Sequence, residues 1–297
     1  MSKSKKSIFK GAATALITPF RDGKVDFSAL GELIDRQIDS GIDALVICGT
    51  TGENATLSDK EHRAVLEFAL ERADGRVPMI AGTGSNDTHH AVEMSNFASS
   101  LGYDGLLVVT PYYNKATEKG LISSFTKIAD SVDTPIVLYN VPTRTCCNIT
   151  LPVYRELAKH ENIVAVKEAS GNISAIAELF AECGDDFDIY SGNDDQTLPM
   201  LALGGSGVIS VVSNIIPKEM KTLCKKWFDG DIMECRRLHK KYLKLMKIMF
   251  CEVNPIPVKT AAEFMGLCSA EMRLPMCAIG EESRKKLEKM LSEYQLI

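Results

Sequence analysis

Several features that mark membrane-spanning, secreted or nucleic-acid-binding proteins are missing from this sequence of 297 residues. Its most apolar stretch, residues 201–216, is interrupted by Gly204, Gly205 and Gly207 and is too short to span a membrane. Residues 1–6 are basic, but no apolar segment follows them, so we expect no secretory signal peptide. The net charge of −5 and the pI of 5.7 argue against a nucleic-acid partner. We therefore expect a cytoplasmic protein with no membrane or nucleic-acid partner.

Disulfide and metal-binding patterns are missing as well. The chain has nine cysteines, an odd number, and no C-x-x-C pair, while Cys146 and Cys147 are adjacent. The five histidines show no metal-ligand spacing, so we expect no metal. The pattern indicates reduced, mostly structural thiols, with Cys48, Cys251 and Cys277 in apolar surroundings.

Common catalytic and cofactor motifs are also absent. The sequence has no P-loop and no Gly-x-Ser-x-Gly turn, and no Gly-x-Gly-x-x-Gly follows the first predicted strand. Carboxylates are plentiful, but no isolated pair points to a glycosidase. These absences argue against a P-loop enzyme, a serine hydrolase of the Gly-x-Ser-x-Gly type and a glycosidase.

What the sequence does contain is a pattern that occurs eight times: a short apolar run, a turn and an amphipathic helical stretch. The helix predicted over residues 58–74 is the clearest, because Ser58 and Glu61 have the spacing of a capping box. The other helices are predicted over residues 26–40, 87–101, 118–130, 151–159, 173–183, 197–203 and 218–229. The apolar runs are residues 13–17, 44–48, 79–81, 106–109, 136–139, 163–167, 187–190 and 207–211.

Strict alternation of strands and helices predicts a parallel sheet. Eight units in about 230 residues favour a closed (β/α)₈ TIM barrel of the α/β class, with an open doubly wound sheet as the alternative. We therefore predict a catalytic barrel over residues 1–230 and a C-terminal helical region over residues 231–297. The helices of this region are expected over residues 231–250, 258–265 and 281–294, with a stiff break at residues 254–257.

Lys167 ends the apolar run 163–167, which has the composition of a strand buried on both faces. A buried ammonium is costly unless it is paired or partly neutral. On this segment alone, pairing with Glu168 or another carboxylate is the more common arrangement. The functional interpretation is a neutral amine that forms a Schiff base with a carbonyl.

Polar and glycine-rich segments follow the predicted strands, at the end where such barrels carry their active sites. Singly, each has a structural explanation: glycine-rich turns reverse the chain, Tyr139 could be a core tyrosine, and Arg144 could be a surface charge. Together with Lys167 they provide a nucleophile, hydroxyls that move protons and amides that hold a carboxylate. This set suits a Schiff-base enzyme acting on a 2-oxo acid. The segments are residues 49–53, 82–86, 110–114, 139–145 and 191–194.

The same residues resemble the lysine-dependent pyruvate aldolases and lyases of the dihydrodipicolinate synthase and N-acetylneuraminate lyase superfamily. The resemblance runs from Gly11 to Pro275. Arg144 makes the chain most similar to the dihydrodipicolinate synthase branch, in which such an arginine binds the carboxylate of aspartate semialdehyde. The matching motifs are Gly49-Thr50-Thr51-Gly52-Glu53, Pro111-Tyr112-Tyr113-Asn114, Tyr139-Asn140-Val141-Pro142, Arg144-Thr145, Lys167-Glu168-Ala169, Gly205-x-Gly207-Val208-Ile209-Ser210 and Asn254-Pro255-Ile256-Pro257-Val258-Lys259.

The resemblance implies a lyase that condenses pyruvate with L-aspartate 4-semialdehyde, the first committed step of lysine and diaminopimelate biosynthesis. It also implies that the reaction needs no metal or organic cofactor. Lys167 would form the imine, and Tyr139, Thr50 and Tyr113 would relay protons. Thr51 would hold the pyruvate carboxylate and Arg144 the aldehyde's carboxylate, with Ile209 and Gly192 also lining the substrate site. The resemblance further implies a homotetramer, a dimer of dimers, in which Tyr113 reaches a neighbouring subunit.

Two departures from the family pattern concern Cys146 and the feedback site. Glycine often follows the arginine–threonine pair, and we expect little effect from Cys146 because it is also small. In lysine-inhibited members, the position of His90 is a glutamate that pairs with the ammonium of lysine, and the position of Asp59 is commonly a histidine. We therefore expect weak or no lysine inhibition of this protein. The positions that match the lysine site are Asn54, Ala55, Asp59, His62, Asn86, His90 and Tyr112.

Two alternatives remain. A sibling pyruvate aldolase would use N-acetylmannosamine or a deoxy-sugar aldehyde, and Arg144 argues against it. A binding protein could sense a 2-oxo acid without turnover, and the complete set of Lys167, Tyr139, Thr50 and Tyr113 argues against that.

Overall fold

Eight parallel strands close into a barrel in the computed structural model, which describes residue 5 and residues 7–297. Their order around the barrel is β1-β10-β9-β8-β7-β6-β5-β4. The predicted TIM barrel is therefore confirmed, and the open doubly wound sheet is wrong. Apart from Lys5, the basic N-terminal segment lies outside the described residues. The strands are β1 (Gly11–Ala15), β4 (Ala44–Ile47), β5 (Met79–Gly82), β6 (Gly105–Val109), β7 (Ile136–Asn140), β8 (Ile163–Glu168), β9 (Asp188–Ser191) and β10 (Gly207–Ser210).

The strands lie close to the predicted apolar runs, and the largest difference is at β1. This strand begins at Gly11 and ends at Ala15, two residues earlier than predicted at each end. The backbone N–H of Ile17 donates to the side chain of Asn214 over 3.1 Å, so Ile17 is held by a side chain and not by a strand ladder. All six residues of β8 are buried, as expected for a parallel strand covered on both faces.

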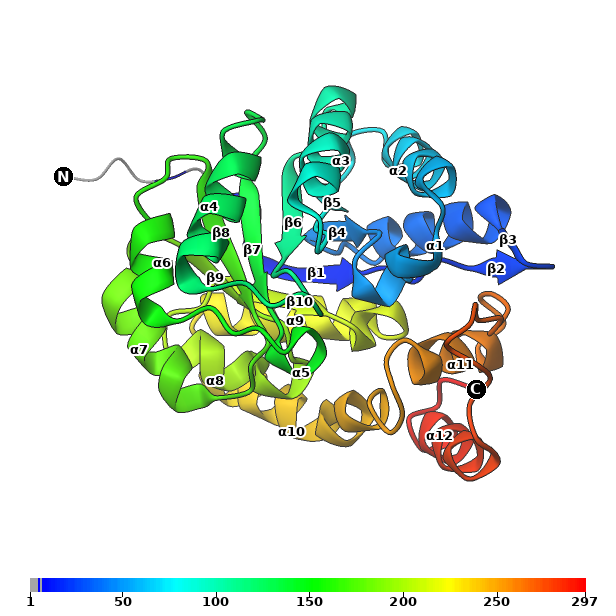
Figure 1. Cartoon of the computed structure of the whole chain (residues 1–297). Helices are drawn as coiled ribbons and strands as arrows, with labels where there is room; N and C mark the ends of the chain where they lie inside the picture. Colours follow the sequence, from blue (N-terminus) through cyan, green and yellow to red (C-terminus); the bar gives the residue numbers. More distant parts are fainter. Residues whose placement is uncertain (1–4, 6) are drawn as a thin grey trace. The chain divides into compact units, whose positions relative to one another are not determined.

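The chain divides into two compact units, and the first runs to Gly11 and from Pro78 to Ile209. Within it, β5 to β9 pair in sequence order, each parallel to the next. Helices α3, α4, α6 and α7 lie along the outside of these strands (Figure 1). The helices of this unit are α3 (Thr88–Leu101), α4 (Glu118–Ala129), α5 (Pro142–Thr145), α6 (Leu151–Leu157), α7 (Ile173–Cys183) and α8 (Thr197–Ala202), with a 3₁₀ turn η3 (Asp194–Gln196).

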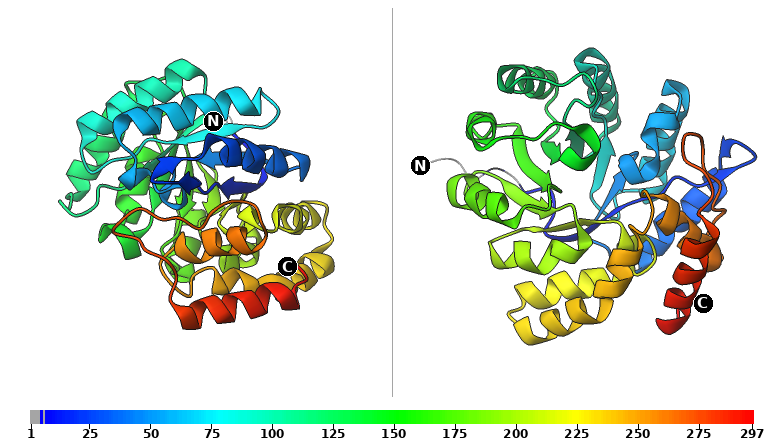
Figure 2. Two further views of the ribbon diagram at one scale, coloured as in Figure 1. Left: turned by 90° about the vertical axis from the view of Figure 1, so that its right-hand side faces the viewer. Right: turned by 60° about the horizontal axis from the view of Figure 1, so that its bottom comes forward.

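The second unit comprises Ala12–Val77 and Ser210–Ile297. Here β1 pairs with β4, and the C-terminal helices α11 and α12 lie side by side (Figure 2). A short hairpin of β2 (Phe20–Arg21) and β3 (Lys24–Val25) was not predicted, because two-residue strands carry no periodic signal. The helices are α1 (Phe27–Asp39), α2 (Asp59–Ala73), α9 (Pro217–Phe228), α10 (Ile232–Ile248), α11 (Ile256–Phe264) and α12 (Glu281–Glu293), with 3₁₀ turns η1 (Thr50–Gly52), η2 (Asn54–Thr56) and η4 (Val212–Asn214).

Local signals placed most helix ends correctly. The capping box at α2 is present, since Ser58 and Glu61 exchange both hydrogen bonds. The predicted break at residues 254–257 is partly wrong, because α11 already begins at Ile256 with Pro257 in its first turn. Proline is tolerated there because its missing N–H would have had no intrahelical partner.

The cysteines are all free, but only part of the prediction for their surroundings is correct. Cys48 is buried, whereas Cys251 and Cys277 are exposed. Both exposed cysteines lie in loops outside helices α10 and α12, where apolar sequence neighbours do not enclose them. Within the described residues, no helix combines the length and apolar character needed to cross a membrane.

Candidate active site

Lys167 lies near the carboxyl end of β8, opposite Tyr139 on the neighbouring strand β7. Lys167 is 4% exposed and Tyr139 is 6% exposed, so both side chains are withdrawn from water. The Lys167 Nζ lies 4.5 Å from the centroid of the Tyr139 ring. In a strand, successive side chains point to opposite faces, so the parallel register places these two on the same face. The structure thus brings together the predicted nucleophile and the predicted proton-transfer group.

Burial lowers the pKa of Lys167 from 10.5 to about 7. Desolvation is the largest cause, because it disfavours the charged ammonium. The Asp194 carboxylate raises the pKa and so opposes this change, while the Arg144 guanidinium lowers it further. A substantial share of Lys167 is therefore a neutral amine near pH 7, which is the form that attacks a carbonyl.

Asp194 is a residue of this site that sequence reasoning did not select. It begins the 3₁₀ turn η3 after β9 and is only 2% exposed. Its carboxylate acts electrostatically on Lys167, which lies one strand away. The available signal was its place just after a strand end, within residues 191–194, but an aspartate there has no distinguishing spacing.

Glu168 is not the partner of Lys167, so pairing with this carboxylate is wrong, and the carboxylate that acts on Lys167 is that of Asp194. Its Oε2 accepts hydrogen bonds from Asn140 Nδ2 at 2.9 Å and Tyr154 Oη at 2.8 Å, and its Oε1 accepts from the Ser170 N–H at 2.7 Å. Burial and the negative charge of Glu168 raise the pKa of Tyr154 well above its usual value. Glu168 therefore ties the end of β8 to β7 and α6 on the face opposite Lys167.

Gly192 gives room to the lysine side chain. A Cβ at this position would lie 3.2 Å from Lys167 Cε and 2.7 Å from the Cβ of Ala169. The Gly192 N–H donates to the carbonyl of Glu168 over 2.7 Å, which holds the loop against β8. Its predicted place in the substrate site remains a prediction, but the close approach already explains why a side chain is not accommodated.

Arg144 lies on the short helix α5, which follows β7 directly. The helix is anchored underneath by Thr145, whose hydroxyl accepts a hydrogen bond from Thr110 at 3.1 Å and donates to the carbonyl of Cys147 at 2.9 Å. Pro142 occupies its first turn. Arg144 itself is exposed. The guanidinium is thus carried on a fixed backbone, with its side chain accessible to a ligand.

Cys146 ends α5 in the left-handed conformation, with φ 52° and ψ 24°. Glycine therefore suits this position because of its backbone freedom, and not only because it is small. A residue with a Cβ costs about 1–2 kcal/mol in this region. The expectation that small size alone is sufficient here is incomplete.

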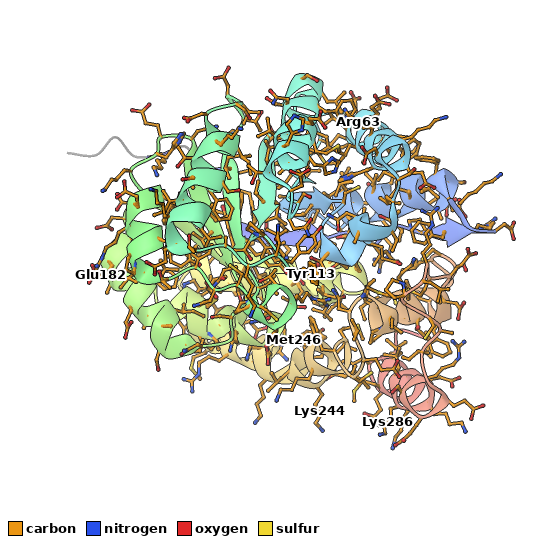
Figure 3. The ribbon with its side chains drawn as sticks, in the orientation of Figure 1. Arg63, Tyr113, Glu182, Lys244, Met246 and Lys286 are labelled. Atoms are coloured by element: carbon orange, nitrogen blue, oxygen red, sulfur yellow. The ribbon has the colours of Figure 1, made fainter. Side chains whose placement is uncertain are left out.

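Tyr113 lies on the loop between β6 and α4 and is 90% exposed (Figure 3). Its φ of 72° is also left-handed. The next residue, Asn114, donates from its side chain to the carbonyl of Asn86 over 2.9 Å and so fixes the loop against the β5–α3 connection. The Tyr113 side chain points outward from its own chain, and its part in a proton relay with Thr50 and Tyr139 remains a prediction.

Thr50 and Thr51 form the 3₁₀ turn η1 after β4, in the second unit. Thr51 is 3% exposed, and its Oγ1 accepts a hydrogen bond from Asn254 Nδ2 at 3.0 Å. The turn closes with Glu53 in the left-handed conformation at φ 53°. Asn254 is a second residue that sequence reasoning did not assign, since it follows Thr51 by about two hundred positions.

The remaining predicted residues fall into both units. Ile209 ends the first unit on β10 and is fully buried. For the positions matched to a lysine site, the first unit contains Asn86, His90 and Tyr112 and the second contains Asn54, Ala55, Asp59 and His62. Among residue 5 and residues 7–297, histidine, cysteine, aspartate and glutamate form no group of three that could hold a metal ion.

Comparison with known proteins gives a consistent answer. The model of the dihydrodipicolinate synthetase family matches residues 8–294. A 4-hydroxy-tetrahydrodipicolinate synthase from Pelobacter propionicus is 50% identical over 98% of this chain and 100% of its own length.

Solved structures agree. Dihydrodipicolinate synthase from Aquifex aeolicus is 48% identical, covers 97% of this chain and 99% of its own, and has a TM-score of 0.95. A structure described as the first monomeric dihydrodipicolinate synthase variant is 40% identical over 98% of each chain, also with a TM-score of 0.95. With the barrel and the strand-end lysine already established, these matches show that the chain belongs to the dihydrodipicolinate synthetase family.

Proposed function

We infer that this chain is a Schiff-base lyase with 4-hydroxy-tetrahydrodipicolinate synthase activity, in lysine and diaminopimelate biosynthesis. It condenses pyruvate with L-aspartate 4-semialdehyde. The observation that carries this function is the desolvated Lys167, with a pKa of about 7, facing Tyr139 on the next strand. Membership of the family indicates which reaction is catalysed, and the Lys167–Tyr139 pair provides the nucleophile and the proton-transfer group for it.

The reaction begins when the neutral amine of Lys167 attacks the ketone carbon of pyruvate. Loss of water leaves an imine, with Tyr139 moving protons to and from the carbinolamine. Loss of a methyl proton gives the enamine, whose carbon attacks the aldehyde of aspartate semialdehyde. The amino group of that substrate then adds to the imine carbon, which closes the ring and releases the lysine. Every proton in this sequence is supplied and accepted by protein groups, water or substrate.

The carboxylates of the two substrates need separate cationic or amide partners. We assign the pyruvate carboxylate to the N–H and hydroxyl of Thr51, and we also assign Ile209 and Gly192 to the binding of substrate. Arg144 takes the carboxylate of aspartate semialdehyde, as the exposed guanidinium on α5 permits. Thr50 and Tyr113 complete the proton relay with Tyr139.

Assembly is part of the proposal. Tyr113 is 90% exposed in its own chain, which is consistent with a side chain that enters the site of a neighbouring subunit. We propose a homotetramer, built as a dimer of dimers, acting in the cytoplasm. One relative is described as a monomeric variant, so the oligomeric state of this chain in solution is the measurement that tests the tetramer.

The decisive assay follows turnover of pyruvate with aspartate semialdehyde through a coupled reductase that oxidises a reduced nicotinamide. Turnover that disappears in Arg144→Ala, while borohydride still traps pyruvate on Lys167, supports both the reaction and the aldehyde. A trapped adduct without turnover would instead support a sugar aldehyde as the second substrate. Without turnover or trapping, and with tight pyruvate binding retained in Lys167→Ala, a sensor of 2-oxo acids would be the better function.

A further inference from the structure

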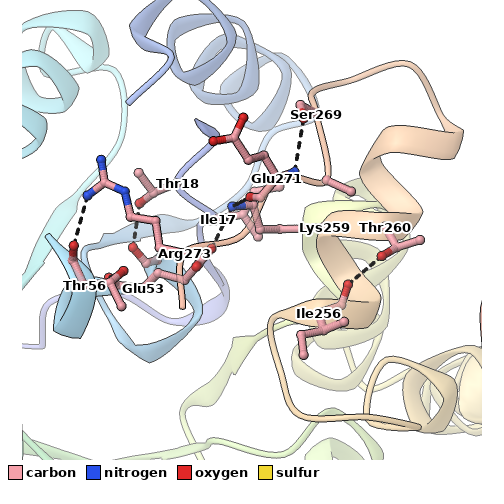
Figure 4. A network of polar contacts seen from close by, with 12 residues as sticks. Ile17, Thr18, Glu53, Thr56, Ile256, Lys259, Thr260, Ser269, Glu271 and Arg273 are labelled. Atoms are coloured by element: carbon pink, nitrogen blue, oxygen red, sulfur yellow. Dashed lines mark hydrogen bonds and ion pairs between the residues drawn. The ribbon is translucent and has the colours of Figure 1, made fainter. Parts of the chain in front are cut away.

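The turn that carries Thr50 and Thr51 is held by the C-terminal region at three successive points. Asn254 donates to the Thr51 hydroxyl at 3.0 Å, and Lys259 Nζ pairs with Glu53 Oε1 at 2.7 Å. Arg273 donates to the carbonyl of Thr56 at 2.9 Å. Figure 4 shows Lys259, Glu53, Thr56 and Arg273 converging from these distant parts of the chain. All of these residues belong to the second unit.

The Lys259–Glu53 pair is completely withdrawn from water. Its side chains are 0% and 1% exposed, and Lys259 Nζ also donates to the carbonyl of Glu271 and lies 4.2 Å from the centroid of the Phe20 ring. Glu53 Oε2 is buried without a hydrogen-bond partner. Burial lowers the pKa of Lys259, and the Glu53 carboxylate opposes that change. A buried ion pair with an unsatisfied oxygen is a poor source of stability, because desolvation offsets the attraction.

The Lys259–Glu53 pair instead helps to fix the backbone conformation of the turn. Glu53 has a left-handed backbone at φ 53° and directly follows the turn η1. A residue with a Cβ keeps such a conformation only where its surroundings enforce it. The ion pair with Lys259 holds the Glu53 side chain, and the Thr18 hydroxyl holds the neighbouring Gly52 carbonyl at 2.7 Å.

Asn254 determines the direction of the Thr51 hydroxyl. A threonine hydroxyl has one proton to donate and two lone pairs that accept. Because Asn254 Nδ2 donates to Thr51 Oγ1, the proton of the Thr51 hydroxyl points away from the Asn254 side chain. It remains available for an anionic ligand on the other side.

We propose that Asn254 and Lys259 are positioning residues that hold the Thr50–Thr51 turn in the form that binds the pyruvate carboxylate. The inference rests on the proposed function, since it assumes that Thr51 takes this carboxylate. It gives the C-terminal helical region a direct part in substrate recognition. Neither residue touches pyruvate; each acts through a residue of the turn.

The test compares Asn254→Leu with Thr260→Val. Thr260 lies on the same helix as Lys259 and is 1% exposed, but its hydroxyl donates to the carbonyl of Ile256 within α11 (Figure 4). In Asn254→Leu, the Thr51 hydroxyl loses the contact that directs it toward the pyruvate carboxylate. The KM for pyruvate should therefore rise about tenfold to a hundredfold, which is the usual worth of a hydrogen bond to a charged group such as this carboxylate, while kcat changes little. Thr260→Val should leave both constants near the wild-type values.

Two further variants separate positioning from a general loss of structure. Asn254→Asp cannot donate to Thr51 and should raise the KM more than Asn254→Leu, because its carboxylate takes the hydroxyl proton. Thr51→Val combined with Asn254→Leu should be no worse than Thr51→Val alone, since both act on one contact. Borohydride trapping of acetone, which has no carboxylate, should be the same in wild type and Asn254→Leu.

For Lys259, the variant Lys259→Met should raise the KM for pyruvate, and adding Glu53→Gln should recover part of the loss by removing the unpaired charge. If Lys259→Met does not fold, the Asn254 variants decide the question. An active wild type with an unchanged KM in Asn254→Leu overturns this inference alone. Equal losses of pyruvate and acetone trapping also overturn it, whereas a wild type that neither traps nor turns over pyruvate overturns the proposed function as well.

Discussion

Asn140 and Glu168 lie opposite each other on β7 and β8 and are joined by a 2.9 Å hydrogen bond, one position beyond the pair Tyr139 and Lys167. Alternation along a strand sends the two pairs to opposite faces. One face therefore carries the reactive amine and the phenol, while the other carries a hydrogen-bonded clamp that keeps the strand ends in register.

Lys167→Met should abolish borohydride trapping of pyruvate and stabilise the fold. A lysine whose pKa is about 7 when folded and 10.5 when unfolded reduces stability, in full below pH 7 and progressively less as the pH rises to 10.5. Removing it should raise the free energy of unfolding near pH 7 by about 2 kcal/mol or more. Denaturant unfolding at pH 7 and pH 10.5 checks this, and a gain that does not shrink at the higher pH would contradict the reasoning.

The rate of imine formation should rise with pH and level off above about pH 7, because only the neutral amine of Lys167 reacts. Asp194→Asn removes a charge that raises this pKa, so the midpoint of the profile should move to lower pH. Arg144→Ala should move it to higher pH. Single-turnover trapping of pyruvate measures all three profiles.

Asp195→Asn is the matched control for this series, since Asp195 is the next residue of the same 3₁₀ turn and does not act on Lys167. Its midpoint should equal that of wild type. Midpoints that move in the same direction for Asp194→Asn and Arg144→Ala would show that charge is not the cause.

Glu168→Leu should lower the free energy of unfolding by about 3 kcal/mol or more, because it leaves the buried Tyr154 hydroxyl and Asn140 amide and the partly buried Ser170 N–H without their acceptor. Tyr154→Phe, which removes one donor, should cost about 1 kcal/mol. Urea unfolding measures both. The milder variant Glu168→Gln should leave the pH midpoint of imine formation in place, and a shifted midpoint would instead make Glu168 a group that tunes Lys167.

Tyr139→Phe and Thr50→Val should each lower turnover by roughly 10²–10⁴, the usual worth of one positioned proton-transfer group. Imine trapping on the slow timescale should persist in both, since Lys167 is intact. Steady-state turnover together with trapping gives the comparison. Unchanged turnover in both variants would remove these two residues from the catalytic set.

Lysine should inhibit this enzyme weakly or not at all. The family resemblance predicts that His90 replaces a glutamate that pairs with the ammonium of lysine in lysine-inhibited members. Losing one carboxylate partner from a buried ammonium costs about 3 kcal/mol or more. Initial rates at increasing lysine concentration test this, and His90→Glu should strengthen inhibition. A low micromolar inhibition constant for the wild type would rule the interpretation out.

The arrangement of strands and helices could be predicted because it rests on local signals. Buried parallel strands are continuous apolar runs, and the capping box of Ser58 and Glu61 begins α2 as expected. Lys167, Tyr139 and Arg144 could be selected because reactive residues follow strand ends in a barrel. The β2–β3 hairpin and the start of α11 at Ile256 could not be predicted from the sequence, since neither has a periodic pattern.

The sequence by itself determined the barrel, the place of the lysine at a strand end and the family, since periodicity and motif spacing are properties of the chain. Only the tertiary structure decided which charges act on Lys167, where Glu168 points and what holds the Thr51 hydroxyl. Asp194 approaches Lys167 from the 3₁₀ turn that follows the neighbouring strand β9, and Asn254 approaches Thr51 from a position about two hundred residues further along the sequence. Desolvation and hydrogen bonding depend on neighbours in space, and spacing along a chain does not specify those neighbours.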